Sequence, residues 1–405
     1  WLDGRMISQI RTYGLTSHAL VALAFIFPFS VSASSALSGL LIALWILEGD
    51  FKAKFEAIRS NRITIAFLLF FALHLVGMLW TEDVKWGLHT LAKYWKLLLV
   101  PVVLTTARKE HLRRYLWAFI LSMTVLVAIS YMSWLHLISV PSILAEDPTP
   151  FMSHIPYNVL LAFAIYLVLC ELIFSRPAKA WLVALLVFLA AAMTVDMFIT
   201  GGRAGQLGFL ALLTILFFQY YNRSIVKPAA LAAVIIPLTL VISYQFSPTF
   251  RARVIEGWSE IQGFKTNPDT SVGKRLAFYI NSMEIIGRNP ILGVGTGDFP
   301  REYQKVNQVN SPSLPDTVNP HNQFILMLVQ FGIAGLPLLI AIFYLQARSA
   351  FQTENILIRY PRLALPVLFG VVMLTDTYLI VHQTAIMFYL FSGIVYKDYD
   401  GPGYP

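Results

Sequence analysis

Long apolar runs recur along the whole chain and are separated by short polar segments. Many approach the ~20 residues that a helix needs to cross a bilayer, which predicts transmembrane helices. The predicted helices cover residues 15–32, 34–48, 63–80, 93–107, 116–138, 157–174, 181–200, 204–221, 228–246, 322–346, 364–380 and 383–396. The stretch 181–221 is split at residues 201–205 because one helix of that length would exceed a bilayer core of about 30 Å. The pattern therefore predicts an all-α integral membrane protein with about 12 transmembrane helices.

Composition and charge agree with this interpretation. Of the 405 residues, 57% are hydrophobic and 13% charged, whereas a soluble domain carries about 25% charge. The net charge of +8 suits basic cytoplasmic loops and needs no nucleic-acid partner. With the N-terminus inside, short loops hold 18 basic residues on the inner side and 4 on the outer side. Both termini are therefore predicted to be cytoplasmic. The single cysteine, Cys170, excludes an intramolecular disulfide.

One outer loop is much longer than the others. Residues 247–320 separate a first membrane part (1–246) from a second part with the C-terminal tail (321–405). Apolar residues recur in this loop at helical spacing around 250–261 and 272–286, which predicts two amphipathic helices. A second outer stretch, residues 82–96, mixes tryptophan and tyrosine with lysine and is typical of an interfacial helix.

Arg203 is the first candidate for an anion-binding residue. It stands in a Gly-Gly-Arg-Ala-Gly turn where two predicted helices meet the outer face. A guanidinium near membrane depth generally faces a wet cavity or an anionic partner, although it can also extend to phospholipid headgroups. The flanking glycines remove side-chain bulk and free N–H groups, which favours close approach of a phosphate. Arg275, in the second loop helix, is compatible with the same role or with a solvated helix face, and Arg288 and Lys274 are weaker cases.

His321 is the candidate for proton transfer. Asn319 and Pro320 read as the N-cap and first residue of a helix, which places His321 in the first turn. The positive helix end would keep its imidazole neutral and able to accept a proton. The alternative is that His321 only caps neighbouring backbone groups. His154, in an outer loop, is the reserve candidate.

Three other motifs resemble nucleotide-binding or metal-binding sites, but their positions argue against those functions. Gly293-x-Gly295-x-Gly297 follows no predicted strand and faces outward, which argues against nucleotide binding. Asp398-Tyr-Asp400 has the spacing of a metal–nucleotide-sugar motif, but it stands in the predicted cytoplasmic tail among turn residues. Asp298 and Glu302 have helical spacing without a nearby histidine, so no metal site is predicted.

Several of these stretches together resemble the O-antigen ligase and polymerase family of bacterial membrane glycosyltransferases. The resemblance rests on Arg203 followed by Leu207, on the Asn289–Phe299 segment, and on Pro320-His321-Asn322 with Gly332 eleven residues after the histidine. The layout, with a large outer loop before the histidine helix, resembles the family as well. Residues before about 190 contribute topology rather than motifs.

The resemblance implies a GT-C-like glycosyltransferase of the Gram-negative inner membrane with its active site facing the periplasm. It implies transfer of O-antigen from undecaprenyl diphosphate to a sugar of lipid A–core, without metal or cofactor. Arg203 and Arg275 would bind the diphosphate and His321 would act on the acceptor. Asn322 and Asp376 would contribute to substrate binding, with Arg288 and Lys274 as further candidates.

Two kinds of alternative stay open. Within the family, the chain would be an O-antigen polymerase or a protein O-oligosaccharyltransferase. A polyprenyl-glycan transporter or flippase is the competing class, but the two halves of the chain differ, whereas many secondary transporters contain related repeats. The acceptor sugar and the oligomeric state are not predicted.

Overall fold

The computed structural model describes residues 4–138, 146–264 and 266–399, and every regular element within these ranges is helical. The first part holds α1 (Gly4–Ile26), α2 (Val31–Leu47), α3 (Phe51–Ser60), α4 (Arg62–Val76), α5 (Val84–Tyr94), α6 (Leu99–Thr106), α7 (Leu112–Trp134), α8 (His154–Phe174), α9 (Ala180–Ile199), α10 (Arg203–Tyr220) and α11 (Val226–Phe246). The outer segment holds α12 (Pro248–Gln262), α13 (Ser271–Arg288) and α14 (Phe299–Asn310). The last part holds α15 (Gln323–Phe331), α16 (Gly335–Ser349), α17 (Ile356–Val372) and α18 (His382–Val395). The all-α prediction is confirmed.

Helix length decides how many of these helices qualify as membrane spans. Six helical segments are long and apolar enough to cross a membrane, or seven if α2 and α3, which are bent by 115° against each other, form one span. Each of the twelve predicted segments contains a helix, but α17 and α18 have only 17 and 14 residues. At 1.5 Å per residue they extend about 21–26 Å, short of a bilayer core of about 30 Å. The chain is a multi-pass membrane protein, and twelve crossings remain a prediction.

Helix α8 lies at the centre of the bundle. Most of its side chains are buried, and it contacts α7, α9, α10, α17 and α18. Gly205 lets α10 approach α8 closely, because a Cβ there would lie 2.3 Å from the backbone carbon of Asn158. Helix α11, by contrast, lies at the edge, and only 11% of its apolar span is buried. Such an exposed apolar helix is stable in lipid rather than in water.

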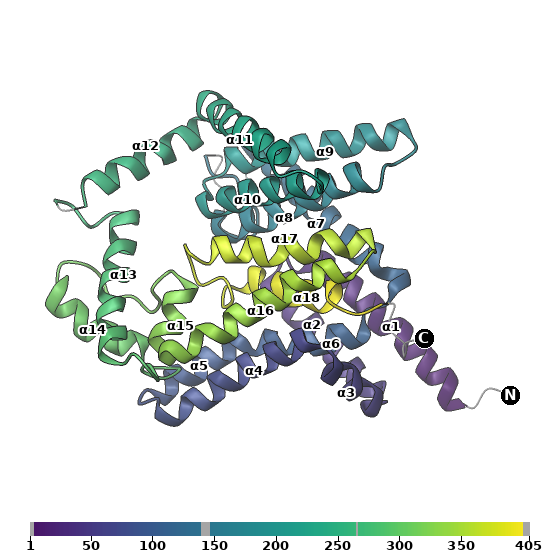
Figure 1. Ribbon diagram of the computed structural model, residues 1–405, viewed down its shortest axis with the longest axis horizontal. Coiled ribbons are helices and arrows are strands. Elements are labelled where there is room, and N and C mark those ends of the chain that lie inside the picture. Colours follow the sequence, from purple (N-terminus) through teal and green to yellow (C-terminus); the bar gives the residue numbers. More distant parts are fainter. Residues whose placement is uncertain (1–3, 139–145, 265, 400–405) are drawn as a thin grey trace.

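The outer segment gathers at one end of the bundle. Figure 1 shows α12, α13 and α14 together at that end, with α3 and the start of α1 at the other. Both stretches predicted to form amphipathic helices are helical, as α12 and α13, but Val254, Trp258 and Ile261 of α12 are exposed and not buried on the membrane domain. The stretch predicted to form an interfacial helix contains α5. The sequence pattern did not predict α14, whose buried residues Phe299, Tyr303 and Val306 pack against the rest of the segment.

Two of the predicted helices differ from the structure in ways that affect the candidate site. The helix predicted over 322–346 is interrupted at Gly332, which has a φ of 57° and whose Cβ position lies 2.4 Å from the backbone of Ile291. The helix predicted over 364–380 ends at Val372, so Asp376 lies in the connection between α17 and α18 rather than in a membrane helix. Asp400 and the Gly401–Pro405 tail lie outside the described residues.

Candidate active site

His321 lies immediately before a helix, not inside it. Helix α15 begins at Gln323, and the side chain of Asn322 caps it by accepting from the N–H groups of Phe324 and Ile325. The prediction that Asn319 caps the helix and Pro320 is its first residue is therefore wrong. Asn319 instead accepts the backbone N–H of His321 at 2.8 Å, and His321 adopts a φ of 51°. The argument that a helix end keeps the ring neutral no longer applies.

The imidazole is instead held by a carboxylate and a phenyl ring. Its Nδ1 lies 3.1 Å from Oδ1 of Asp376, and the ring stacks on Phe278 at 5.7 Å between centroids. With Nδ1–H donating to the carboxylate, Nε2 is left as the acceptor. Nε2 has no hydrogen-bond partner within the described ranges. This is the geometry of a general base oriented by an acid.

Asp376 remains charged beside this ring. It is 6% exposed, and burial alone would raise its pKa. The hydrogen bond and charge of His321, the N–H of Thr377 at 2.7 Å and the nearby charge of Arg275 outweigh burial and hold the pKa of Asp376 below its ordinary value. The carboxylate is therefore ionised at neutral pH and fixes the orientation of the histidine.

Backbone contacts fix the histidine and aspartate segments against each other. The hydroxyl of Tyr279 donates to the carbonyl oxygens of His321 (3.1 Å) and Leu374 (3.0 Å). The side-chain amide of Asn322 donates to Leu374 as well, at 3.1 Å, and the Gln323 N–H donates to the carbonyl of Met373 at 2.9 Å. Asn322 thus helps to hold the two segments together, and the substrate-binding role that the family resemblance implies for it stays a prediction.

Arg275 is a positive charge close to the His321–Asp376 pair. It lies one turn before Phe278 and Tyr279 on α13, close enough to affect the Asp376 carboxylate electrostatically. It is half-buried, and it makes no hydrogen bond or ion pair with any residue that the structure describes. The other two cations predicted on α13 are engaged: Lys274 pairs with Asp269 at 2.8 Å, and Arg288 pairs with Glu284 one turn away.

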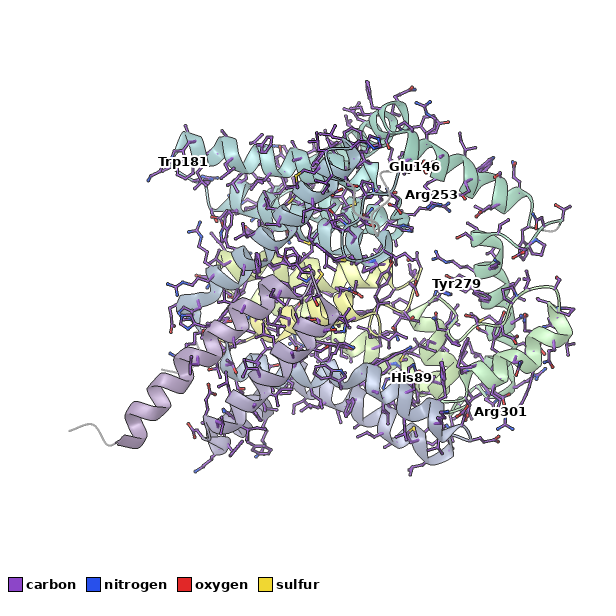
Figure 2. The ribbon with its side chains drawn as sticks, turned by 180° about the vertical axis from the view of Figure 1, so that it is seen from behind. His89, Glu146, Trp181, Arg253, Tyr279 and Arg301 are labelled. Atoms are coloured by element: carbon purple, nitrogen blue, oxygen red, sulfur yellow. The ribbon has the colours of Figure 1, made fainter. Side chains whose placement is uncertain are left out.

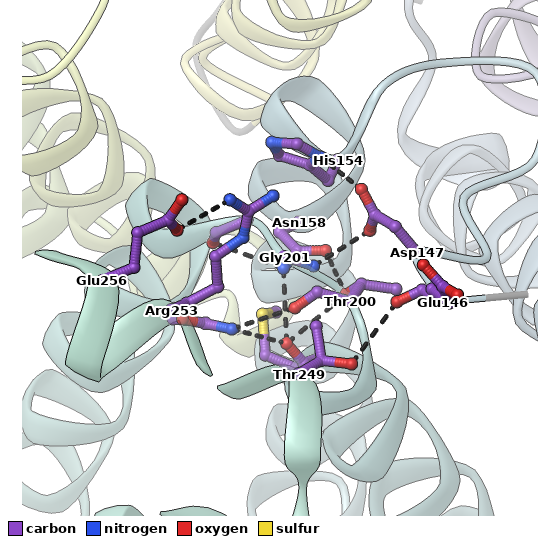
Figure 3. A network of polar contacts seen from close by, with 12 residues as sticks. Glu146, Asp147, His154, Asn158, Thr200, Gly201, Thr249, Arg253 and Glu256 are labelled. Carbon is purple, nitrogen blue, oxygen red and sulfur yellow. Dashed lines mark hydrogen bonds and ion pairs between the residues drawn. The ribbon is translucent and has the colours of Figure 1, made fainter. Parts of the chain in front are cut away.

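Arg203 belongs to a second polar cluster, at the start of α10. Its guanidinium lies 2.7 Å from Oε2 of Glu256. The guanidinium of Arg253 lies 3.0 Å from the same oxygen, and Figure 3 shows Arg253 and Glu256 side by side. The hydrogen bond from Arg253 and the charges of both arginines lower the pKa of Glu256, although burial opposes them. Two arginines from different helices thus converge on one anionic oxygen.

The turn before Arg203 is built by packing and by a carboxylate. Asp147 accepts the N–H of Gly201 at 3.0 Å and pairs with His154 (Figure 3). Burial would raise the pKa of Asp147, but these two hydrogen bonds and the nearby charges of His154 and Arg253 lower it. A Cβ on Gly202 would lie 2.5 Å from the carbonyl oxygen of His154. The glycines therefore serve close packing, and the freed Gly201 N–H binds Asp147.

The two clusters are connected through α12 and α13. These helices are consecutive and contact each other; α12 also contacts α9 and α11, and α13 contacts α15. Figure 2 shows Arg253 and Tyr279 at the same end of the bundle as the exposed residues His89 and Arg301.

The sequence did not single out three residues of the Arg203 cluster, namely Arg253, Glu256 and Asp147. The three-residue spacing of Arg253 and Glu256 on a helix predicts their ion pair, but it does not predict the contact of Glu256 with Arg203.

The acidic residues considered for metal binding have other partners. Asp298 accepts the N–H groups of Glu82 (2.8 Å) and Asp83 (2.7 Å), and Glu302 pairs with Lys305. Among the described residues, no group of three or more His, Cys, Asp or Glu side chains is arranged to hold a metal. The glycine loop also serves packing, because a Cβ on Gly293 would lie 2.4 Å from the backbone of Gln330.

Comparison with known proteins finds a family match for the segment that contains Arg203, Arg275 and His321. Residues 188–340 match a family model described as O-antigen ligase. This segment belongs to the O-antigen ligase family. The O-antigen ligase segment runs from α9 into α16 and contains Arg203, Arg275 and His321, but not Asp376.

A relative is found in Haemophilus influenzae. An uncharacterized protein of that organism is 28% identical over 211 residues, which cover 49% of this chain and 51% of that protein. The chain thus matches about half the length of this relative.

Proposed function

We propose that this chain is a metal-independent glycosyltransferase that moves an O-antigen glycan from undecaprenyl diphosphate to a sugar hydroxyl of lipid A–core. The observation that carries the proposal is the His321–Asp376 pair beside Arg275, at the membrane-domain end that bears the outer segment. Neither Nε2 of His321 nor the Arg275 guanidinium has a partner among the residues that the structure describes. Family membership of residues 188–340 supports the lipid-linked glycan as donor. We further propose that this end faces the periplasm of a Gram-negative inner membrane, that both termini are cytoplasmic, and that the fold is GT-C-like.

In the proposed reaction, His321 accepts the proton of the acceptor hydroxyl at Nε2. The hydroxyl oxygen forms a bond to the anomeric carbon of the glycan, and the bond from that carbon to the diphosphate oxygen breaks. The electron pair leaves on undecaprenyl diphosphate. Arg275 and Arg203, together with Arg253, meet the growing negative charge, because guanidinium forks match phosphate oxygens and stay charged at any working pH.

An apolar groove beside the arginine cluster supports a lipid-linked donor. A cavity of about 390 Å³ lies between α7, α9 and α11 and is lined mainly by apolar side chains, Trp134, Phe198, Ile242 and Phe246 among them. It extends to Ser247, whose hydroxyl donates to the carbonyl of Phe198 directly before α12 begins. A polyprenyl chain in this groove would place its diphosphate near the helix that carries Arg253.

The test is transfer by purified protein supplied with a carrier-linked glycan, with and without lipid A–core. Product that requires lipid A–core supports the ligase, elongated carrier-linked glycan identifies a polymerase, and glycan on protein side chains identifies a protein O-oligosaccharyltransferase. Absence of all three products contradicts the proposal and favours a transporter. Activity should survive EDTA, and Arg203→Lys and Arg275→Lys should both be strongly impaired. The matched control is Arg301→Lys, an exposed arginine paired with Glu82.

Loss of activity in EDTA would contradict the metal-independent mechanism. If EDTA abolishes activity, Mg²⁺ or Mn²⁺ restores it, and both Arg→Lys variants remain active, the arginines are not the groups that stabilise the leaving diphosphate. Asp298, Glu302 and Asp316 would then become the residues to test.

A further inference from the structure

A second large cavity lies away from the candidate active site. It has a volume of about 740 Å³ and is formed by the α3–α4 junction, the end of α16, the start of α17 and the segment after α18. Helix α4 starts at this cavity, and the backbone carbonyl oxygen of His74, near its other end, accepts a hydrogen bond from the Thr296 hydroxyl of the outer segment at 2.7 Å. The cavity thus lies at the opposite end of α4 from the outer segment, within the range of about 300–1,000 Å³ typical of ligand sites.

Three arginines line this cavity. Arg62 from α4 and Arg348 from α16 are exposed, and neither makes a hydrogen bond or ion pair with a residue that the structure describes. Arg362 from α17 is 6% exposed and donates to the carbonyl oxygens of Val395, Ser349 (3.2 Å) and Lys397 (2.7 Å). Arg362 therefore stays in the wall as a fixed positive charge, while Arg62 and Arg348 are available to a ligand.

The acidic residues of the lining are Glu354 and Asp398. Glu354 directly precedes Asn355, the N-cap of α17. A carboxylate at that position interacts favourably with the positive end of the helix, so its presence is explained without an arginine partner. Asp398 is engaged in interactions with its surroundings.

Arg62 occupies an unfavourable position for a cation. It is the first residue of α4, whose N-terminus is capped by Asn61 accepting the Thr64 N–H at 2.9 Å. The partial positive charge of a helix N-terminus repels a cation placed in the first turn. An anion in the cavity would offset this repulsion and give Arg62 and Arg348 a partner.

We propose that this cavity binds a phosphate-bearing anion through Arg62 and Arg348. Guanidinium groups bind phosphate oxygens with two parallel hydrogen bonds, and basic pockets between membrane helices bind anionic lipid headgroups. The phosphate comes either from an anionic phospholipid or from a soluble phosphate compound. The inference does not depend on the proposed transfer reaction.

Two probes distinguish the sources. Purified full chain is titrated with phosphatidylglycerol against phosphatidylcholine, with bound lipid counted by native mass spectrometry. The same protein in phosphatidylcholine nanodiscs is titrated with inorganic pyrophosphate by calorimetry. The variant Arg62→Gln/Arg348→Gln should bind the true ligand at least about tenfold more weakly. The control Arg114→Gln/Arg223→Gln removes two exposed charges outside the cavity and should bind like the wild type.

Each outcome decides the question. Loss of phosphatidylglycerol binding alone identifies a lipid headgroup, and loss of pyrophosphate binding alone identifies a soluble compound. Loss of both shows that the cavity recognises the phosphate itself. Equal binding of both probes by wild type, variant and control overturns the proposal, as does equal weakening in the variant and the control.

Discussion

Asp376→Asn is the substitution that best separates a working His–Asp pair from a contact that only stabilises the fold. Asparagine keeps the size of the side chain but removes the charge that faces Nδ1 of His321 at 3.1 Å. It can also present an N–H group to the ring, which favours the tautomer with its proton on Nε2. A ring in that tautomer cannot accept the proton of the acceptor hydroxyl.

The size of the effect follows from the contact. A hydrogen bond to a charged group contributes about 1.5–3 kcal/mol, and each 1.4 kcal/mol is a factor of ten in rate. If that contribution applies to the transition state, kcat should fall about 10- to 150-fold. KM for the donor should change little. His321→Ala removes the base itself and should lower kcat by about 10²–10⁴-fold.

The assay is steady-state transfer with each variant and with the double variant. Because Asp376 acts through His321, adding Asp376→Asn to His321→Ala should cost nothing further. Asp50→Asn is the matched control, because this carboxylate is exposed and makes no helix-capping hydrogen bond, and His89→Ala is the control for loss of an exposed outer histidine. The reasoning is refuted if Asp376→Asn retains kcat within twofold. It is also refuted if the substitution lowers the residual activity of His321→Ala by the same factor as in the wild type.

Three further predictions test other parts of the structure. Glu256→Gln removes the carboxylate shared by Arg203 and Arg253, so donor KM should fall several-fold; an unchanged or higher KM would show that the arginines do not bind donor. Because the pKa of Asp376 is lowered in the fold, its stabilisation is complete above about pH 4 and is lost as pH falls through the lowered value. The difference in Tm between the wild type and Asp376→Asn should therefore shrink as the pH falls below about 4, and a constant difference at lower pH would contradict this pairing. In a Cys170→Ala background, Ser259→Cys should react with an impermeant thiol reagent in intact cells, and labelling at Lys52→Cys instead would show the opposite orientation.

The helices could be predicted because apolar length is a local property of the sequence. Each predicted segment contains a helix, and residues 250–261 and 272–286 form the two amphipathic helices that their spacing indicates. The helix start near His321 could not be predicted as easily, because two asparagines, Asn319 and Asn322, are both suitable N-caps. Pro320 suits a first helical position, but Asn322 accepts two backbone N–H groups and so fixes the start at Gln323.

The site itself depends on contacts that no local pattern encodes. His321 meets Asp376, 55 positions later, and Arg203 meets Glu256, 53 positions later. The sequence singled out His321 and Arg203 by residue type and setting, and Asp376 by family resemblance. It did not indicate that Arg203 pairs with Glu256, or that both ends of the Asn322 side-chain amide contact backbone groups. Such pairings follow from the packing of distant helices, which one sequence does not specify.

The arrangement of the two clusters explains why the proposed site would need the outer segment in its folded form. Arg203 and His321 stand at the starts of α10 and α15, on the membrane domain. Arg253 and Arg275 are supplied by α12 and α13, which contact each other and reach from α9 and α11 to α15. Tyr279, on the same face of α13 as Arg275, also holds the His321 and Leu374 carbonyls. One helix thus carries both a candidate phosphate-binding cation and the contact that fixes the base. Displacing α13 would therefore weaken donor binding and misplace the histidine together, so the proposed transfer would proceed only while the outer segment stays packed on the membrane domain.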